Sequence, residues 1–163
     1  MEGAASVACD PELQVKRLLL ISLCLLCSAM AADKNKSTEQ EAAGHIQELK
    51  HKIERDSERD VCIDSADLVR ELVEQFNTEM NSGELQPAQQ TLNDIGSYAD
   101  KARDAAKSSH HKLKQAELTL HKSARRLADI GQSLAMENRQ AITEVVHKIE
   151  AADDDILNQV FKN

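Results

Sequence analysis

The residues of this 163-residue chain that could do chemistry are its six histidines and its clustered carboxylates. No two histidines stand four residues apart, the spacing that aims two imidazoles from one helix at a single metal ion. Glu41 and His45 have this spacing with a carboxylate, as do Glu117 and His121, but such pairs arise by chance in a charged helix. The acidic run at residues 153–155 lacks the alternation and the glycine of a calcium-binding loop. We therefore interpret these groups as solvated surface and predict no metal site.

Covalent and acid–base catalysis need other patterns. They require a nucleophile beside a base, or paired carboxylates in a shielded pocket. The chain has no G-x-S-x-G, HExxH, P-loop or dinucleotide-binding motif. We predict that the protein is not an enzyme and that it holds no cofactor, so its function must reside in its surfaces.

The elements that position these surfaces are predicted to be helices. The chain contains two Phe, one Tyr, no Trp, two Pro and five Gly. Because strands draw on aromatic and β-branched residues and are separated by Gly/Pro turns, this composition argues against a sheet. The length indicates one small domain, which we place at residues 38–163. We predict an all-α fold, an elongated helical bundle or coiled coil in which two shorter helices precede a long one.

Residues 1–31 are interpreted as a cleaved signal peptide. The basic pair Lys16-Arg17 precedes the apolar run of residues 18–26, and Ala29 and Ala31 would stand at −3 and −1 of the cleavage site. The run is shorter than the roughly 20 apolar residues that span a bilayer. We therefore predict a secreted protein that is not transmembrane after signal cleavage.

The residues that follow the signal bear on the same question. Residues 32–37 are polar and expected to be disordered, and Asn35 heads a glycosylation sequon. Cys62 would be the only cysteine left in the mature chain, so it could form no internal disulfide. We predict an optional intermolecular bridge through it. In the alternative interpretation, translation starts at Met30 and the protein is a cytoplasmic coiled-coil adaptor.

Capping residues and apolar periodicity place the first two helices. Thr38 and Glu41 match a capping box, which begins a first helix that we expect to end near residue 58. Asp64 or Ser65 is predicted to cap a second helix, and residues 81–83 (Asn-Ser-Gly) are predicted to end it.

The third helix is predicted to be unusually long. From Pro87, which suits the first turn of a helix, apolar and small residues recur at steps of three and four until Leu127. At 1.5 Å per residue, residues 87–130 would form a rod about 65 Å long. The alternative is a break at residues 108–111 (Ser-Ser-His-His), although none of these residues forbids a helix. Gly131 leaves open whether residues 132–161 continue this helix or fold back. The large residues of this stripe, predicted to form a core or an interface, are Leu92, Ile95, Leu113, Leu120, Leu127, Leu134, Val145, Ile149 and Ile156.

The formal charge of −8 is unevenly distributed. Residues 38–84 carry 13 acidic and 5 basic side chains, whereas residues 101–126 carry 8 basic and 2 acidic ones. Nucleic-acid binding requires a wide basic surface and usually aromatic residues for stacking, so we predict no nucleic-acid partner. We expect the basic stretch to lie antiparallel against the acidic second helix of its own chain or of another chain. Its members are Lys101, Arg103, Lys107, Lys112, Lys114, Lys122, Arg125 and Arg126.

Two kinds of partner remain. The heptad stripe predicts association with partner helices, most simply in an antiparallel homodimer. In the alternative, the amphipathic helices open onto a lipid surface, and in size, charge and helical content the chain is similar to the exchangeable insect apolipoproteins. Lipid-binding helices usually add Trp, Phe or Leu to the apolar face, whereas the basic stretch offers mostly Ala. We therefore favour a secreted, non-catalytic helical protein that binds itself or another helical protein.

Overall fold

The computed structural model describes residues 40–55, 59–134 and 136–162. The chain divides into two compact units, Met1–Glu41 and Ala42–Asn163, and the fold described below is that of the second. The expected signal peptide (residues 1–31), the polar lead (residues 32–37), the sequon at Asn35 and the capping residue Thr38 lie outside the described residues.

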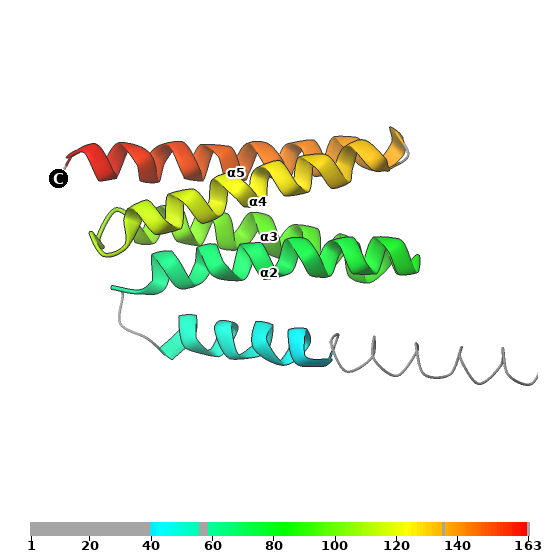
Figure 1. Ribbon diagram of the computed structural model, residues 1–163, viewed down its shortest axis with the longest axis horizontal. Helices are drawn as coiled ribbons and strands as arrows, with labels where there is room; N and C mark the ends of the chain where they lie inside the picture. Colours follow the sequence, from blue (N-terminus) through cyan, green and yellow to red (C-terminus); the bar gives the residue numbers. More distant parts are fainter. Residues whose placement is uncertain (1–39, 56–58, 135, 163) are drawn as a thin grey trace, which may run out of the picture. The chain divides into compact units, whose positions relative to one another are not determined.

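Every regular element in the described part of the chain is an α-helix, which confirms the all-α prediction. A helix at residues 40–55, here called the leading helix, is followed by four more (Figure 1). These are α2 (Val61–Ser82), α3 (Leu85–Ala105), α4 (Leu113–Ser133) and α5 (Met136–Lys162). None of the helices in the described ranges is both long enough and apolar enough to cross a membrane.

The end of α2 follows the turn chemistry of the sequence. Gly83 caps the helix with φ 76°, a left-handed conformation that glycine adopts without a side-chain clash. The Gly83 N–H donates to the carbonyl of Met80 at 3.2 Å, and the Glu84 N–H donates to the carbonyl of Glu79 at 2.9 Å. The predicted end of this helix is therefore confirmed, and α3 returns beside α2 as the second arm of a hairpin.

The single long helix predicted for residues 87–130 is wrong. Helix α3 ends at Ala105 and α4 begins at Leu113, with Lys112 at φ 56° between them. The connection is held by the start of α2: the Ser109 hydroxyl donates to the carbonyl of Arg59 at 2.6 Å, and the His111 ring lies 2.9 Å from the Asp60 carboxylate. These bonds replace the helical ones, and the small stripe residues of this segment contribute little burial that would hold a straight rod together.

The second hairpin, α4–α5, folds back close to Gly131, as one of the two sequence alternatives proposed. Helix α4 ends at Ser133, Leu134 is extended, and α5 starts at Met136. The fold-back provides the helix that covers the apolar stripe. The stripe is thus covered by a helix of the same chain.

The two hairpins stack on each other with equivalent helices in contact. Helix α2 packs against α3 and α4, and α5 packs against α4 and α3. Arg126, the fourteenth residue of α4, binds Glu74, the fourteenth residue of α2, so these helices run parallel and in register. The expected antiparallel packing of the basic stretch on the second helix of its own chain is therefore wrong for α4, since the crossover at residues 106–112 reverses the direction of α4. Packing on a helix of another chain stays a prediction.

The leading helix covers the opposite face of the α2–α3 hairpin. Its side chains Ile46, Leu49 and Ile53 are all buried. Lys50 bonds to Asp94 of α3 at 3.0 Å, and Lys52 bonds to Asp64 of α2 at 2.7 Å. The α2–α3 hairpin is thus enclosed between this helix and the α4–α5 hairpin.

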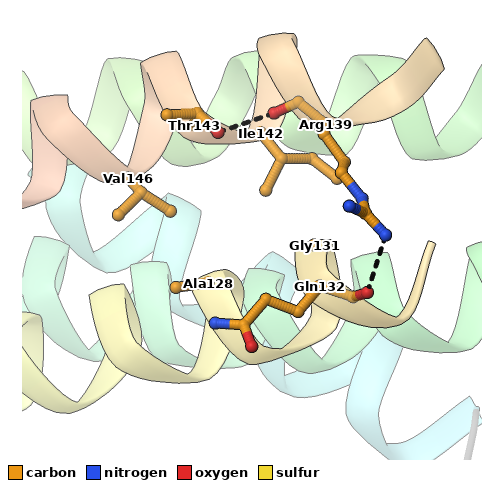
Figure 2. A pocket seen from close by; sticks show the side chains of 7 residues that line it. All are labelled: Ala128, Gly131, Gln132, Arg139, Ile142, Thr143 and Val146. Carbon is orange, nitrogen blue, oxygen red and sulfur yellow. Dashed lines mark hydrogen bonds between the residues drawn. The ribbon is translucent and has the colours of Figure 1, made fainter. Parts of the chain in front are cut away.

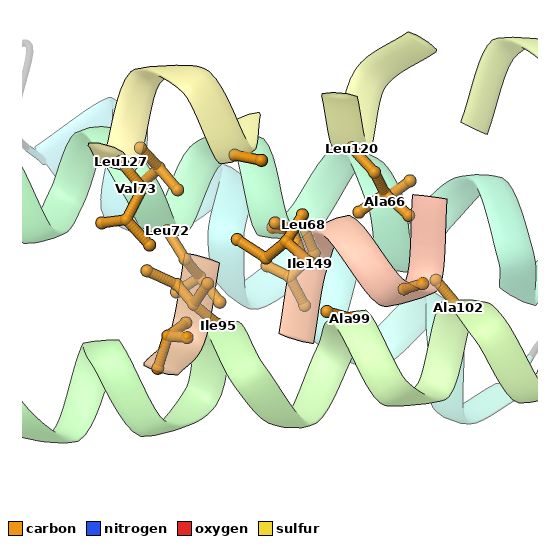
Figure 3. Packing of buried hydrophobic residues seen from close by; sticks show 14 of the residues in the cluster. Ala66, Leu68, Leu72, Val73, Ile95, Ala99, Ala102, Leu120, Leu127 and Ile149 are labelled. Carbon is orange, nitrogen blue, oxygen red and sulfur yellow. The ribbon is translucent and has the colours of Figure 1, made fainter. Parts of the chain in front are cut away.

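The core lies between the two hairpins and combines large aliphatic side chains with alanines (Figure 3). Alanines such as Ala99 and Ala102 on α3 are fully buried and allow close approach of the neighbouring helices. The structure places the large stripe residues in this core of the chain itself. Those that are buried are Leu92, Ile95, Leu113, Leu120, Leu127, Val145, Ile149 and Ile156, and Leu134 is partly buried against them.

Candidate functional site

The carboxylates and histidines of the described residues do not assemble into a metal site. No group of three or more His, Cys, Asp or Glu side chains in the described ranges could hold an ion. His121 points instead at Asp153 of α5, with 3.0 Å between ring nitrogen and carboxylate oxygen. The acidic run is also divided, because Asp153 is buried while Asp154 and Asp155 are exposed.

Cys62 lies in the first turn of α2. The predicted cap at Asp64 or Ser65 had placed it before the second helix, in the connection between helices. Its side chain has no exposed surface, and burial raises the pKa of the thiol to about 11. A thiol in this position cannot reach a second molecule while α2 is folded. The predicted intermolecular bridge through Cys62 is therefore wrong for the folded chain.

The start of α2 also differs from the predicted cap. The helix begins at Val61, so Asp64 and Ser65 lie within it and are buried rather than capping it. Asp64 instead receives the hydrogen bond from Lys52 of the leading helix. The sequence indicated a polar role for Asp64, but it did not indicate the partner Lys52, 12 residues earlier.

A polar cluster marks the point where the starts of α2 and α4 meet. Arg59, Ser109 and His111 line an open cavity of about 400 Å³ there. The hydrogen bond from His111 lowers the pKa of the Asp60 carboxyl. Because Ser109 binds Arg59 and His111 binds Asp60, this cluster links the two hairpins.

The basic stretch does not form one surface. Arg103 and Lys107 bind acidic residues one turn away on their own segment, at 2.8 and 2.7 Å, and Arg126 binds Glu74 of α2. Lys101 lies 6.0 Å from the Tyr98 ring. The exposed Lys112, Lys114, Lys122 and Arg125 belong to the start and length of α4.

An open apolar surface lies on the outer face of the α4–α5 hairpin, which faces away from α2 and α3. Near the fold-back, side chains of both helices surround a cavity of about 180 Å³ (Figure 2). The two helices come close here because Gly131 has no side chain: a Cβ at this position would lie 2.9 Å from Ile142 Cγ2. The cavity is lined by Ala128, Gly131 and Gln132 of α4 and by Arg139, Ile142, Thr143 and Val146 of α5.

Arg139 closes one end of this cavity. Its guanidinium donates to the carbonyls of Leu134 at 3.0 Å and Gln132 at 3.1 Å, at the C-terminal end of α4. Cations are favourable at this end of a helix because they complement its unpaired carbonyls. The Arg139 guanidinium therefore fixes the fold-back, and it leaves the apolar floor of the cavity open to solvent.

The same face continues along both helices beyond this cavity. In its middle, His121 and Asp153 face each other, and burial raises the pKa of the Asp153 carboxyl. Towards the other end, the side chain of Leu118 is 45% exposed and that of Phe161 is 80% exposed. We call this face the outer groove. Its residues on α4 are Leu118, His121, Arg125, Ala128 and Gln132, and on α5 Thr143, Val146, Glu150, Asp153, Leu157 and Phe161.

Sequence reasoning assigned the core stripe and did not single out this second stripe beside it. The signal was present: residues 118, 121, 125, 128 and 132 recur at three- and four-residue steps, as do residues 143, 146, 150, 153, 157 and 161. It was missed because charged residues interrupt it. Comparison with models of protein families, with curated proteins and with solved structures finds no match to this chain.

Proposed function

We propose that the protein is a non-catalytic interaction module that takes up amphipathic helices in the outer groove of its α4–α5 hairpin. One observation carries the proposal: within the described residues, other helices cover the α2–α3 hairpin on both faces but cover the α4–α5 hairpin on one face only. Its free face holds an apolar cavity of about 180 Å³ and two exposed large apolar side chains, Leu118 and Phe161. Apolar clefts of this kind, rimmed by polar groups, are where helices dock in other proteins.

The chain offers a model for such docking in its own leading helix. This helix lies on a hairpin face and buries Ile46, Leu49 and Ile53, which follow one another at steps of three and four. Two lysines bind carboxylates beside it, Lys50 to Asp94 and Lys52 to Asp64. A helix in the outer groove would use the same combination of an apolar stripe and flanking charges.

A helical partner suits the outer groove better than a lipid surface. Its middle is charged, with His121, Arg125, Glu150 and Asp153 at neighbouring positions. His121 and Asp153 bind each other and Glu150 binds His147, but acyl chains would bury Arg125, which forms no ion pair in the described ranges, without an acceptor for its charge. Lipid-binding helices also carry Trp, which this chain lacks. Secretion and the alternative start at Met30 remain predictions, and the proposed activity is the same in either compartment.

The test is selection of helical peptides from a display library against the folded full chain. The chain is kept at about 10 nM, far below the micromolar range in which small interfaces associate. We expect enriched peptides with apolar residues at i, i+4 and i+7 that fail to bind the double variant Leu118→Asp/Phe161→Asp. The matched control is Leu85→Asp, because Leu85 is a large apolar residue that is 62% exposed but lies on α3, outside the outer groove. Enrichment that ignores the double variant, or none at all, would contradict the proposal.

A further inference from the structure

We infer that the partner of the outer groove is the same groove of a second copy, so that two chains form a two-fold dimer with α4 of each over α5 of the other. The inference rests on the proposed function, since it names the occupant of the same surface. It depends on the order in which charged and apolar side chains follow one another along the groove.

The register of the hairpin sorts the groove residues into levels. The His121–Asp153 pair and the shared cavity of Ala128 and Val146 show which positions of α4 and α5 stand opposite each other. In an antiparallel pair, each step forward along α4 is matched by a step back along α5. Arg125 therefore stands at the level of Glu150, and Leu118 stands at the level of Leu157.

These levels alternate in character. The level of Leu118 and Leu157 is apolar, the two central levels are charged, and the level of Ala128 and Val146 is apolar again. Within the charged levels the basic groups lie on α4 and the acidic groups on α5. Such a face is complementary to itself when it is rotated by 180° about an axis parallel to the helices.

This rotation places each level of one copy opposite the same level of the other copy. Apolar residues of one copy meet apolar residues of the other, and Arg125 of one copy faces Glu150 of the other. Arg125 is exposed and forms no ion pair with any residue in the described ranges, whereas Glu150 binds only the exposed His147, at 3.1 Å. A two-fold axis perpendicular to the helices would instead place Arg125 near its own counterpart and Glu150 near its own, which like charges oppose.

The size of the surface indicates how strong the association should be. Helices α4 and α5 contain 21 and 27 residues, so the shorter one is about 32 Å long. With a width of about 10 Å for each helix, the groove covers about 600 Å² per copy, or about 1,200 Å² in total. This is the lower end for specific interfaces, so we expect a dimer that dissociates in the micromolar range.

Sedimentation equilibrium of the full chain between about 1 and 200 µM tests the inference, with far-UV circular dichroism to confirm the fold of each variant. We expect a dimer that either charge reversal alone, Arg125→Glu or Glu150→Arg, weakens by about tenfold or more, because both symmetric ion pairs become repulsive. Mixing the two single variants should restore the dimer, because both pairs are attractive in the mixed species. The double variant Arg125→Glu/Glu150→Arg should associate like the unaltered chain.

Three results would overturn the inference. They are a monomer at 200 µM, a dimer that neither reversal weakens, and a monomer that binds phosphatidylglycerol vesicles instead. The peptide selection separates this failure from that of the proposed function. A monomeric chain that still enriches groove-binding helices retains the interaction function and loses only the second copy as its partner.

Discussion

Helices α2 and α4, the first helices of the two hairpins, have nearly equal lengths but are buried to different extents. Helix α2 has 22 residues and buries 11 of them, because the leading helix, α3 and α4 surround it. Helix α4 has 21 residues and buries 8, in one stripe that faces α2 and α5. The buried fraction of each helix thus follows the number of its neighbours. The other side of α4 has no neighbouring helix in the described ranges, and with α5 it forms the surface of the proposed interaction.

The largest expected contrast between the two hairpins is in thiol reactivity. In a chain whose cysteines 9, 24 and 27 are replaced by Ser, Cys62 of α2 should react with Ellman's reagent only when the protein unfolds. It is fully buried with a pKa of about 11, so it should react more slowly than in urea by about 1,000-fold or more. A cysteine introduced by Leu118→Cys in the outer groove should react at once. Fast reaction of Cys62 would show that the α2–α3 hairpin opens easily.

The next largest effect compares the two faces of α4. Leu120→Ala should lower the free energy of unfolding by about 2–5 kcal/mol, because Leu120 is fully buried and its loss leaves a cavity. Leu118→Ala, two residues away and 45% exposed, should lower it by less than about 1 kcal/mol. Urea unfolding followed by circular dichroism measures both. Equal effects would mean that Leu118 is covered in solution, and dilution of the protein would then distinguish a dimer from a different fold.

Two glycines sharpen the comparison further. Gly131→Ala should lower the free energy of unfolding by about 1 kcal/mol, since contact with Ile142 outweighs the gain in helix propensity. Gly96→Ala on α3 should raise the free energy of unfolding by about 0.5–1 kcal/mol, because alanine has the higher helix propensity. Its Cβ would lie 3.5 Å from Cδ of the flexible Lys148 side chain, which is an ordinary van der Waals contact. Thermal melting of both variants provides the measurement. Stabilisation by Gly131→Ala would show that α4 and α5 are further apart at the cavity than described.

The smallest effects concern two carboxyls with opposite pKa shifts. The pKa of Asp60 is lowered by its hydrogen bond with His111, so Asp60 stabilises the fold above its ordinary value of 3.8, and this contribution disappears as the pH falls through the lowered pKa. The pKa of Asp153 is raised by burial, so its charged form destabilises the fold at neutral pH, and the penalty disappears as the pH falls through the raised pKa.

The matched variants Asp60→Asn and Asp153→Asn should therefore differ in sign. At pH 6 the first should lower the urea midpoint and the second should raise it or leave it unchanged. Each difference from the unaltered chain should decrease as the pH falls through the pKa of the carboxyl concerned, first for Asp153→Asn and at lower pH for Asp60→Asn. A loss of stability in Asp153→Asn at pH 6 would mean that the ion pair with His121 outweighs the burial of the carboxylate.

Much of the local structure could be predicted from the sequence because it depends on neighbouring residues. A composition with few large rings and few turn residues indicates helices. Gly83 ends α2 because glycine tolerates the left-handed conformation found there. The stripe from Leu92 to Ile156 predicted buried side chains correctly, since any amphipathic helix turns its apolar face inward. It could not say whether the covering helix belongs to the same chain.

Only the tertiary structure decided where the long pattern breaks and which faces remain open. None of the residues between 106 and 112 forbids a helix, and the break depends on hydrogen bonds from Ser109 to Arg59 and from His111 to Asp60, which are about 50 residues apart in sequence. The crossover that follows sets α4 parallel to α2, buries Cys62 and leaves the outer groove uncovered by any other helix of the described ranges. Periodicity specifies the apolar side of each helix, but contacts between distant segments determine which neighbour covers it, and these have no local signature.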